Sequence, residues 1–266
     1  MANGTLFAKT LRDQRRSLPA WAAGLFILGL YLAYLYPFFS RGASGLLKMI
    51  GSLPPIIKNL IGQANPMATP EGFFALQPFS IFGPLLFLLL AIGRGSEAAA
   101  GEFENGTLDL LLAHPISRQR LVLEKFFAQA VALALLALAM WGGLGAGTRL
   151  FAISLNLGRL AEAALSLYLL ALAFLALTLA LSCWSLNRRL SIAISGTWAV
   201  VSYLVNAYAP MVSSLRPFRP YSLFFYYNGH NPLVNGIHAG HAAVLAAVCV
   251  ISLLAALLLF QRRDLA

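Results

Sequence analysis

Residues 162–183 read EAALSLYLLALAFLALTLALSC, an apolar run whose only ionised side chain, Glu162, stands at its end. A helix rises about 1.5 Å per residue, so about 20 apolar residues cross the hydrocarbon layer of a bilayer. Five other windows meet this requirement. The six predicted spans are residues 19–39, 73–92, 126–147, 162–183, 191–210 and 239–260. The sequence therefore predicts an all-α membrane protein with six transmembrane helices, forming a single domain over residues 1–266.

The composition supports this fold class and excludes others. The chain has 266 residues, of which 59% are hydrophobic and 11% charged, whereas soluble domains are about 45–50% apolar and about 25% charged. A chain this hydrophobic is not disordered. The net charge is +10, but the basic residues are scattered between the apolar runs and form no stripe. No nucleic-acid partner is therefore predicted.

The positions of the basic residues predict the orientation. Six spans put both termini on one side of the membrane, and the segments on that side hold 12 Lys and Arg residues against 7 on the other. Because Lys and Arg are enriched in cytoplasmic loops, both termini are predicted to be cytoplasmic. The second span contains Pro78 and Pro84, which we expect to kink the helix without breaking it.

Two segments are predicted to be external. Residues 40–72 carry apolar side chains at helical spacing around Pro54 and Pro55, which predicts two short amphipathic helices at the membrane interface. Residues 211–238 are rich in aromatic side chains, which favour the depth of the lipid headgroups. This second segment is predicted to be interfacial or re-entrant.

The cytoplasmic segment 93–125 contains five of the nine acidic residues of the chain. A solvated loop would explain the charge, but the pattern predicts more. Asn105-Gly106 is a strong turn dipeptide, Thr107 can cap a helix over residues 108–113, and Pro115 ends that helix. Such a helix is too short to be stable alone in water. Its leucines are therefore expected to dock into an apolar groove of a cytoplasmic partner. Ser117 is a second capping residue, opening the helix that leads into the third span.

This segment closely resembles the first cytoplasmic loop of the permease subunits of type-2 ATP-binding-cassette (ABC) exporters. The positions that carry the resemblance are Gly101, Glu102, Glu104, Gly106, Thr107, Leu108, Leu110, Leu111, Leu112, Pro115, Ser117, Arg118 and Lys125. The ending FQRRDL, residues 260–265, is also similar to the C-terminus of that family.

The resemblance implies a permease that forms the substrate pathway of an exporter in the cell (plasma or inner) membrane. Two permease copies, a homodimer or a heterodimer with a paralogue, would each rest on a separate cytoplasmic ATPase, with membrane lipid around them. The loop 97–125 would couple the two through its short helix. The residues expected to couple to the ATPase are Glu102, Glu104, Gly106, Thr107, Leu108, Leu110, Leu111, Pro115 and Arg118.

The chain itself is not expected to be an enzyme. It has no G-x-x-x-x-G-K-[ST] motif with which to bind ATP, and no catalytic residue or cofactor is predicted. Residues 1–18, with Leu6, Phe7 and Leu11 among basic residues, are expected to form an amphipathic helix on the cytoplasmic membrane face, hinged near Pro19.

Other functions and sites were weighed against this one. A self-contained secondary transporter would need ionisable residues within its spans, which are nearly absent. His238 and His241 are three residues apart, but we expect interfacial histidines and no metal site. Asn206 in the fifth span either lines the substrate pathway or bonds a neighbouring helix. Gly143 and Gly147 form a G-x-x-x-G motif that is expected to serve packing within one subunit in preference to a dimer seam.

Overall fold

The computed structural model of the chain describes residues 6–50, 69–106, 117–210 and 212–261. These residues contain no strand, and six helical segments are long and apolar enough to cross a membrane. Each predicted window falls on one of these segments, so the all-α, six-span prediction is confirmed. The segments are α2 (Ser17–Ile50), the continuous helix Pro70–Glu104, α8 (Arg118–Leu150), α9 (Leu157–Ser185), α10 (Arg188–Tyr208) and α13 (Ala239–Gln261).

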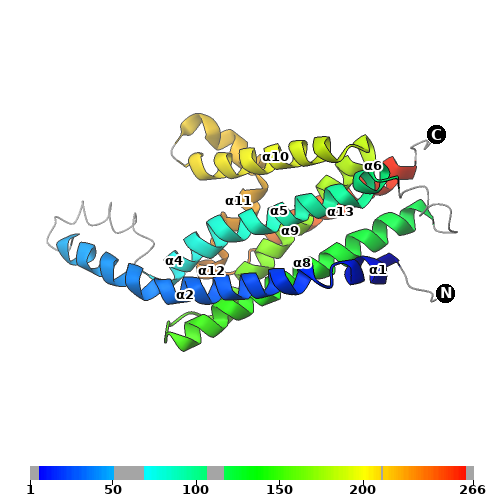
Figure 1. Ribbon diagram of the computed structural model, residues 1–266. Helices are drawn as coiled ribbons and strands as arrows, with labels where there is room; N and C mark the ends of the chain where they lie inside the picture. Colours follow the sequence, from blue (N-terminus) through cyan, green and yellow to red (C-terminus); the bar gives the residue numbers. More distant parts are fainter. Residues whose placement is uncertain (1–5, 51–68, 107–116, 211, 262–266) are drawn as a thin grey trace.

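α9 is the central helix of the bundle (Figure 1). It packs against α8, α10, α13 and α5 (Gly83–Ser96). α2 and the N-terminal α1 (Leu6–Asp13) pack along α8. The start of α1 and the end of α13 lie at the same end of the bundle as α6 (Glu102–Glu104), which we call the α6 end; α4 (Pro70–Leu76) lies toward the opposite, α4 end (Figure 1).

The predicted amphipathic N-terminal helix is present as α1. Leu6, Phe7 and Leu11 are half-buried, whereas Lys9 and Arg12 are exposed or partly so along its outer side. The helix ends in a turn at residues 14–16, before α2 begins at Ser17. Its apolar side chains pack toward α8.

The seam between α2 and α8 depends on glycine. A Cβ atom on Gly143 would collide with the backbone carbonyl of Phe26, and one on Gly29 would lie 2.7 Å from the amide nitrogen of Leu144. The two backbones can approach this closely only because these positions carry no side chain. The G-x-x-x-G motif therefore packs against a helix of its own chain, as predicted.

The second span remains one helix despite its two prolines. The segment η2 (Gln77–Phe82) is a π-helix, and the N–H of Gly83 bonds the carbonyl of Pro78 five residues earlier. Pro84 has no N–H to bond the carbonyl of Phe79, and the hydroxyl of Tyr227 donates to that carbonyl. A neighbouring element thus satisfies the freed group, as expected of a proline in a transmembrane helix.

Two predicted loops begin later than expected. The second-span helix continues through a second π-helix, η3 (Glu97–Gly101), to Glu104, so residues 93–104 are helical. The acidic residues suggested a loop, but the buried Ala98, Ala99 and Ala100 hold this turn in the bundle. The first span likewise runs past residue 39 to Ile50 without a break, so the first predicted interfacial helix is continuous with it. The rest of that pair, residues 51–68, lies outside the described residues.

The segment predicted to be external and aromatic folds back onto the bundle. It forms the 3-10 helix η4 (Ser213–Tyr221), α11 (Leu223–Asn228) and α12 (Pro232–Asn235). Phe224 and Tyr227 are buried, and α11 packs against α9, α10 and α13. Phe218 and Tyr221 of η4 are exposed. The aromatic residues therefore divide between the bundle interior and its surface.

The close approach of α2 and α8 predicts that alanine at two adjacent glycines changes the stability of the protein by different amounts. Gly143→Ala should destabilise the protein by about 1–3 kcal/mol, because the new methyl group pushes α2 away from α8. Gly142→Ala is the matched control, since its Cβ would lie 3.7 Å from the ring of Phe26, an ordinary contact. Thermal unfolding in detergent measures both. Equal unfolding temperatures for the two variants would contradict the close approach.

Candidate functional site

The predicted coupling residues that the structure describes gather at the α6 end. Glu102 and Glu104 belong to α6, Gly106 follows it, and Arg118 begins α8. Gly106 has a φ of +65°, the left-handed conformation that completes the predicted Asn105-Gly106 turn. Ser117 caps α8 as predicted, its hydroxyl accepting from the N–H of Arg120. The remaining coupling residues, Thr107, Leu108, Leu110, Leu111 and Pro115, lie outside the described residues.

Glu102 forms an ion pair with the buried Lys125. The ammonium of Lys125 lies 2.5 Å from Oε1 of Glu102 and donates to the carbonyl oxygen of Ala98 at 3.0 Å. Lys125 is only 7% exposed, and a buried ammonium is costly unless it is paired. The pair ties the end of the second-span helix to the start of α8, on either side of residues 107–116. Sequence reasoning placed Lys125 at the start of a span and gave it no role.

Glu104 and Glu97 both contact Arg188, the first residue of α10. Oε1 of Glu104 accepts from the backbone N–H of Arg188 at 2.8 Å. Nη2 of Arg188 donates to Oε1 of Glu97 at 2.8 Å, and the other oxygen of Glu97 lies 3.5 Å from Nη1 of Arg94. Neither Glu97 nor Arg188 was predicted as a site residue, because a contact across 91 positions leaves no local signal in the sequence.

A fourth carboxylate bonds the N-terminal helix. Glu124 of α8 accepts from the backbone N–H of Phe7 at 3.0 Å and from Nε of Arg120 at 2.6 Å. Together with Glu97, Glu102 and Glu104, it forms a group of four bonded carboxylates at the α6 end. A polar cavity of ≈ 210 Å³ lies there between α1, the second-span helix and α8. Its lining is Thr10, Asp13, Gln14, Arg94, Glu97, Ala98, Glu102, Lys125 and Gln129.

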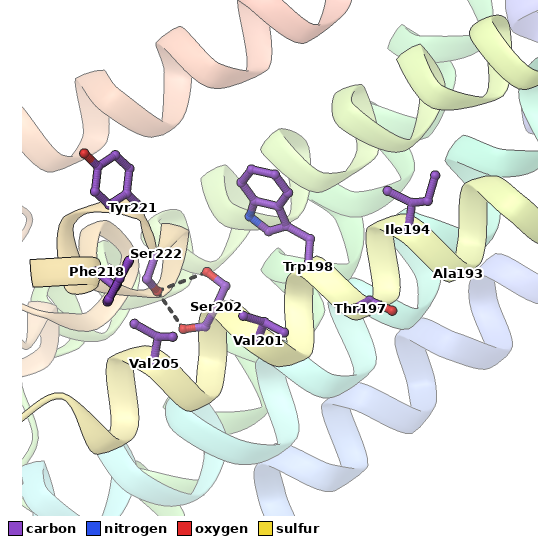
Figure 2. A pocket seen from close by; sticks show the side chains of 10 residues that line it. All are labelled: Ala193, Ile194, Thr197, Trp198, Val201, Ser202, Val205, Phe218, Tyr221 and Ser222. Carbon is purple, nitrogen blue, oxygen red and sulfur yellow. Dashed lines mark hydrogen bonds between the residues drawn. The ribbon is translucent and has the colours of Figure 1, made fainter. Parts of the chain in front are cut away.

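A larger cavity opens along α10 and is mostly apolar. Its volume is ≈ 640 Å³, within the range of about 300–1,000 Å³ that small-molecule sites have. Figure 2 shows that α10 supplies most of the side chains and η4 the rest. The hydroxyls of Ser202 and Ser222 bond each other at 3.0 Å, and Ser222 also donates to the carbonyl of Ser202. The other lining residues are Ala193, Ile194, Thr197, Trp198, Val201, Val205, Phe218 and Tyr221.

Asn206, the predicted pathway residue, comes directly after the lining residue Val205 but does not itself line the cavity. Its Oδ1 accepts from Nε of Arg219 at 3.4 Å. The guanidinium of Arg219 also lies over the ring of Phe225, 4.9 Å from its centre, a favourable cation–π contact. Asn206 therefore helps to join α10 to η4, which forms the second wall of the cavity.

Three of the four histidines lie together near the start of α13, and His114 lies outside the described residues. The ring centres of His230, His238 and His241 are 4.8 to 6.2 Å apart. Over residues 6–50, 69–106, 117–210 and 212–261, no group of three His, Cys, Asp or Glu side chains is arranged to hold a metal ion.

Six apolar helices with α9 at their centre, charged contacts at one end and an apolar cavity along one span define a multi-pass membrane protein of the permease type. A family model described as an ABC-2 family transporter protein matches residues 5–265. The chain therefore belongs to the ABC-2 transporter family, and that family implies a cytoplasmic ABC ATPase as partner. Among curated proteins, none matches the chain.

The buried Lys125–Glu102 pair predicts an asymmetric pair of substitutions. Glu102→Ala should destabilise the protein by about 2 kcal/mol, because it leaves a buried ammonium without its carboxylate. Lys125→Met should cost less, since Glu102 is partly exposed and can be hydrated. The double variant should be more stable than Glu102→Ala alone. Chemical unfolding in detergent measures all three, and simple additivity of the two single effects would contradict the pairing.

Proposed function

We propose that this chain is the transmembrane permease subunit of an ABC exporter, coupled to a separate cytoplasmic ATPase through the loop 97–125. The match of the ABC-2 family model over residues 5–265 carries this proposal. The motif of the loop supports the coupling role, because the short leucine-bearing helix that the sequence predicts would need an external apolar groove to be stable. Closure of the ATPase pair would then favour one of two arrangements of the permease.

The charged contacts at the α6 end support the same role. Residues 107–116 lie in the chain between Gly106 and Ser117, and the Glu102–Lys125 pair joins the helices on either side of them. A force applied to the loop is therefore delivered to two spans at once. The rival function, a secondary transporter, needs ionisable groups near the middle of the membrane. In the described span helices, the ionisable Lys, Arg, Asp and Glu side chains lie toward the helix ends.

The cavity along α10 is our candidate for part of the substrate pathway, with Asn206 at its side. Most of α10 faces outward: Trp198, Val200 and Val201 are about half exposed. A second permease copy, identical or paralogous, would enclose this face, and membrane lipid would cover the apolar surfaces that remain. We further propose that the whole chain is one transmembrane domain, with residues 211–238 external and both termini on the cytoplasmic side of the cell membrane.

This orientation is tested by cysteine labelling. Phe103 at the α6 end and Val234 at the α4 end are both exposed, so each is replaced by cysteine in a chain without Cys183 and Cys249. A membrane-impermeant maleimide should label Val234→Cys in intact cells. It should label Phe103→Cys only after the membrane is permeabilised. The reverse pattern would place the coupling loop outside the cell and refute the proposed function.

The coupling role is tested at Leu111. Leu111→Asp should leave membrane insertion intact but abolish co-purification with the ABC ATPase, because a carboxylate cannot enter an apolar groove without losing its hydration. Stimulated ATP hydrolysis should be lost with it. Both are measured on the tagged chain purified from its native membrane.

Val234→Asp is the matched control for this variant. It introduces the same charge on an exposed apolar residue at the opposite end of the bundle, and it should retain the ATPase. Unchanged binding and hydrolysis in Leu111→Asp would refute the coupling role of the loop.

A further inference from the structure

We infer that Glu97, Glu104 and Arg188 form a joint that makes α10 follow the coupling loop, so that α10 is the span through which nucleotide chemistry changes the apolar cavity. This inference rests on the proposed function. It adds Glu97 and Arg188 as positioning residues and gives Glu104 a partner within the chain. We call these three residues the acid–arginine joint.

The two carboxylates of the joint bond both the backbone and the side chain of Arg188. Glu104 accepts from the N–H of Arg188, and Glu97 accepts from its guanidinium, each at 2.8 Å. The first N–H groups of a helix have no acceptor within the helix, and a carboxylate there is also favoured by the helix dipole. Asn187 caps the same turn through the N–H of Leu190. Glu104 therefore acts as a second cap, supplied by a different span.

The position of Glu104 in the chain makes it the first point that a moving loop would displace. It is the last residue of α6, and the Asn105-Gly106 turn follows directly. Across the joint, the cavity lining begins at Ala193, five residues after Arg188. Figure 1 shows the end of the second-span helix beside the start of α10. The joint thus connects the last described turn before the loop to the helix that lines the cavity.

α10 is packed in a way that allows it to be moved. It buries four residues along its length, whereas α9 buries fifteen. The four share small side chains and recur on one face: Ser191, Ser195, Ala199 and Ser202. Small side chains interlock less than large ones, so a shift along this face disturbs few packing contacts. A helix packed through small side chains on one face can respond to a displacement at its start, where the joint holds it.

The strength of the joint suits a contact that breaks and reforms. The side chains of Glu97 and Arg188 are 43% and 41% exposed, and ion pairs at such exposure add little to stability because water screens them. The Lys125–Glu102 pair beside it is far more buried, at 9% and 28%. The buried pair therefore serves to fix the loop ends, whereas the joint can be rearranged at small cost during a transport cycle.

The test follows α10 directly in the complex of the full chain with its ATPase. Thr197 is exposed and lines the cavity (Figure 2). Thr197→Cys, in a chain without Cys183 and Cys249, is labelled with N-ethylmaleimide before and after the ATPase is trapped with ATP and vanadate. With the joint intact, trapping should change the labelling rate by about fivefold or more, the usual scale of coupling between two sites.

Arg188→Gln should remove most of this nucleotide-dependent change while the ATPase still co-purifies and hydrolyses ATP. Glu97→Gln should weaken the change independently, which keeps the test decisive if one variant folds poorly. Arg188→Lys, which restores a cation, should recover part of the response. Arg188→Gln combined with Glu104→Ala should abolish it. Glu124→Gln is the matched control, because Glu124 makes the same kind of contact to α1, and it should respond as the parent does.

Two outcomes would refute the inferred role of the acid–arginine joint but leave the proposed function intact. One is an ATPase-bound parent whose labelling does not change with nucleotide, since α10 is then not moved. The other is a full response in Arg188→Gln and Glu97→Gln. If no ABC ATPase co-purifies with the parent chain, the proposed function itself fails, and the joint fails with it.

Discussion

The absence of water in hydrocarbon is the constraint on which the rest of this structure depends. A backbone carbonyl left unpaired there has no solvent to bond, so the chain must satisfy it internally. In the second span, Pro78 and Pro84 have no backbone N–H, so carbonyl groups one turn earlier lose their usual helical hydrogen bonds. A π-helical turn absorbs the irregularity, and the hydroxyl of Tyr227 bonds the carbonyl that Pro84 leaves free. The aromatic segment 213–228 is thereby anchored to the helix whose other end is α6.

The same constraint explains why charge is concentrated at the α6 end. Ionised groups are stable only where water, an opposite charge or a backbone dipole supports them. Four carboxylates there each accept a hydrogen bond from another part of the chain: Glu97 and Glu104 from Arg188, Glu102 from Lys125 and Glu124 from Phe7. These contacts join the second-span helix, α1, α8 and α10 at one end of the bundle.

Much of the fold could be predicted because its signals are local. The spans followed from hydrophobic length, the turn at Gly106 from a dipeptide, and the cap at Ser117 from its place before a helix. The segment 93–125 was treated as one loop after the apolar window, but its residues 93–104 continue the second-span helix. Glu97 reaches Arg188 while the neighbouring Ala98, Ala99 and Ala100 are buried. One turn of this helix thus has a charged side and a buried apolar side. The average composition of the segment cannot show that both occur in the same turn.

By itself, the sequence determined the all-α class, the six spans, the tight seam motif at Gly143 and the motif that resembles the ABC-2 family. Each of these depends on residues close together in the chain. Only the tertiary structure decided that Glu102 pairs with Lys125, that Glu104 caps α10, and that α10 and η4 line an open apolar cavity. Such contacts join residues far apart in sequence, and their energy depends on distance and burial, which exist only once the helices have packed.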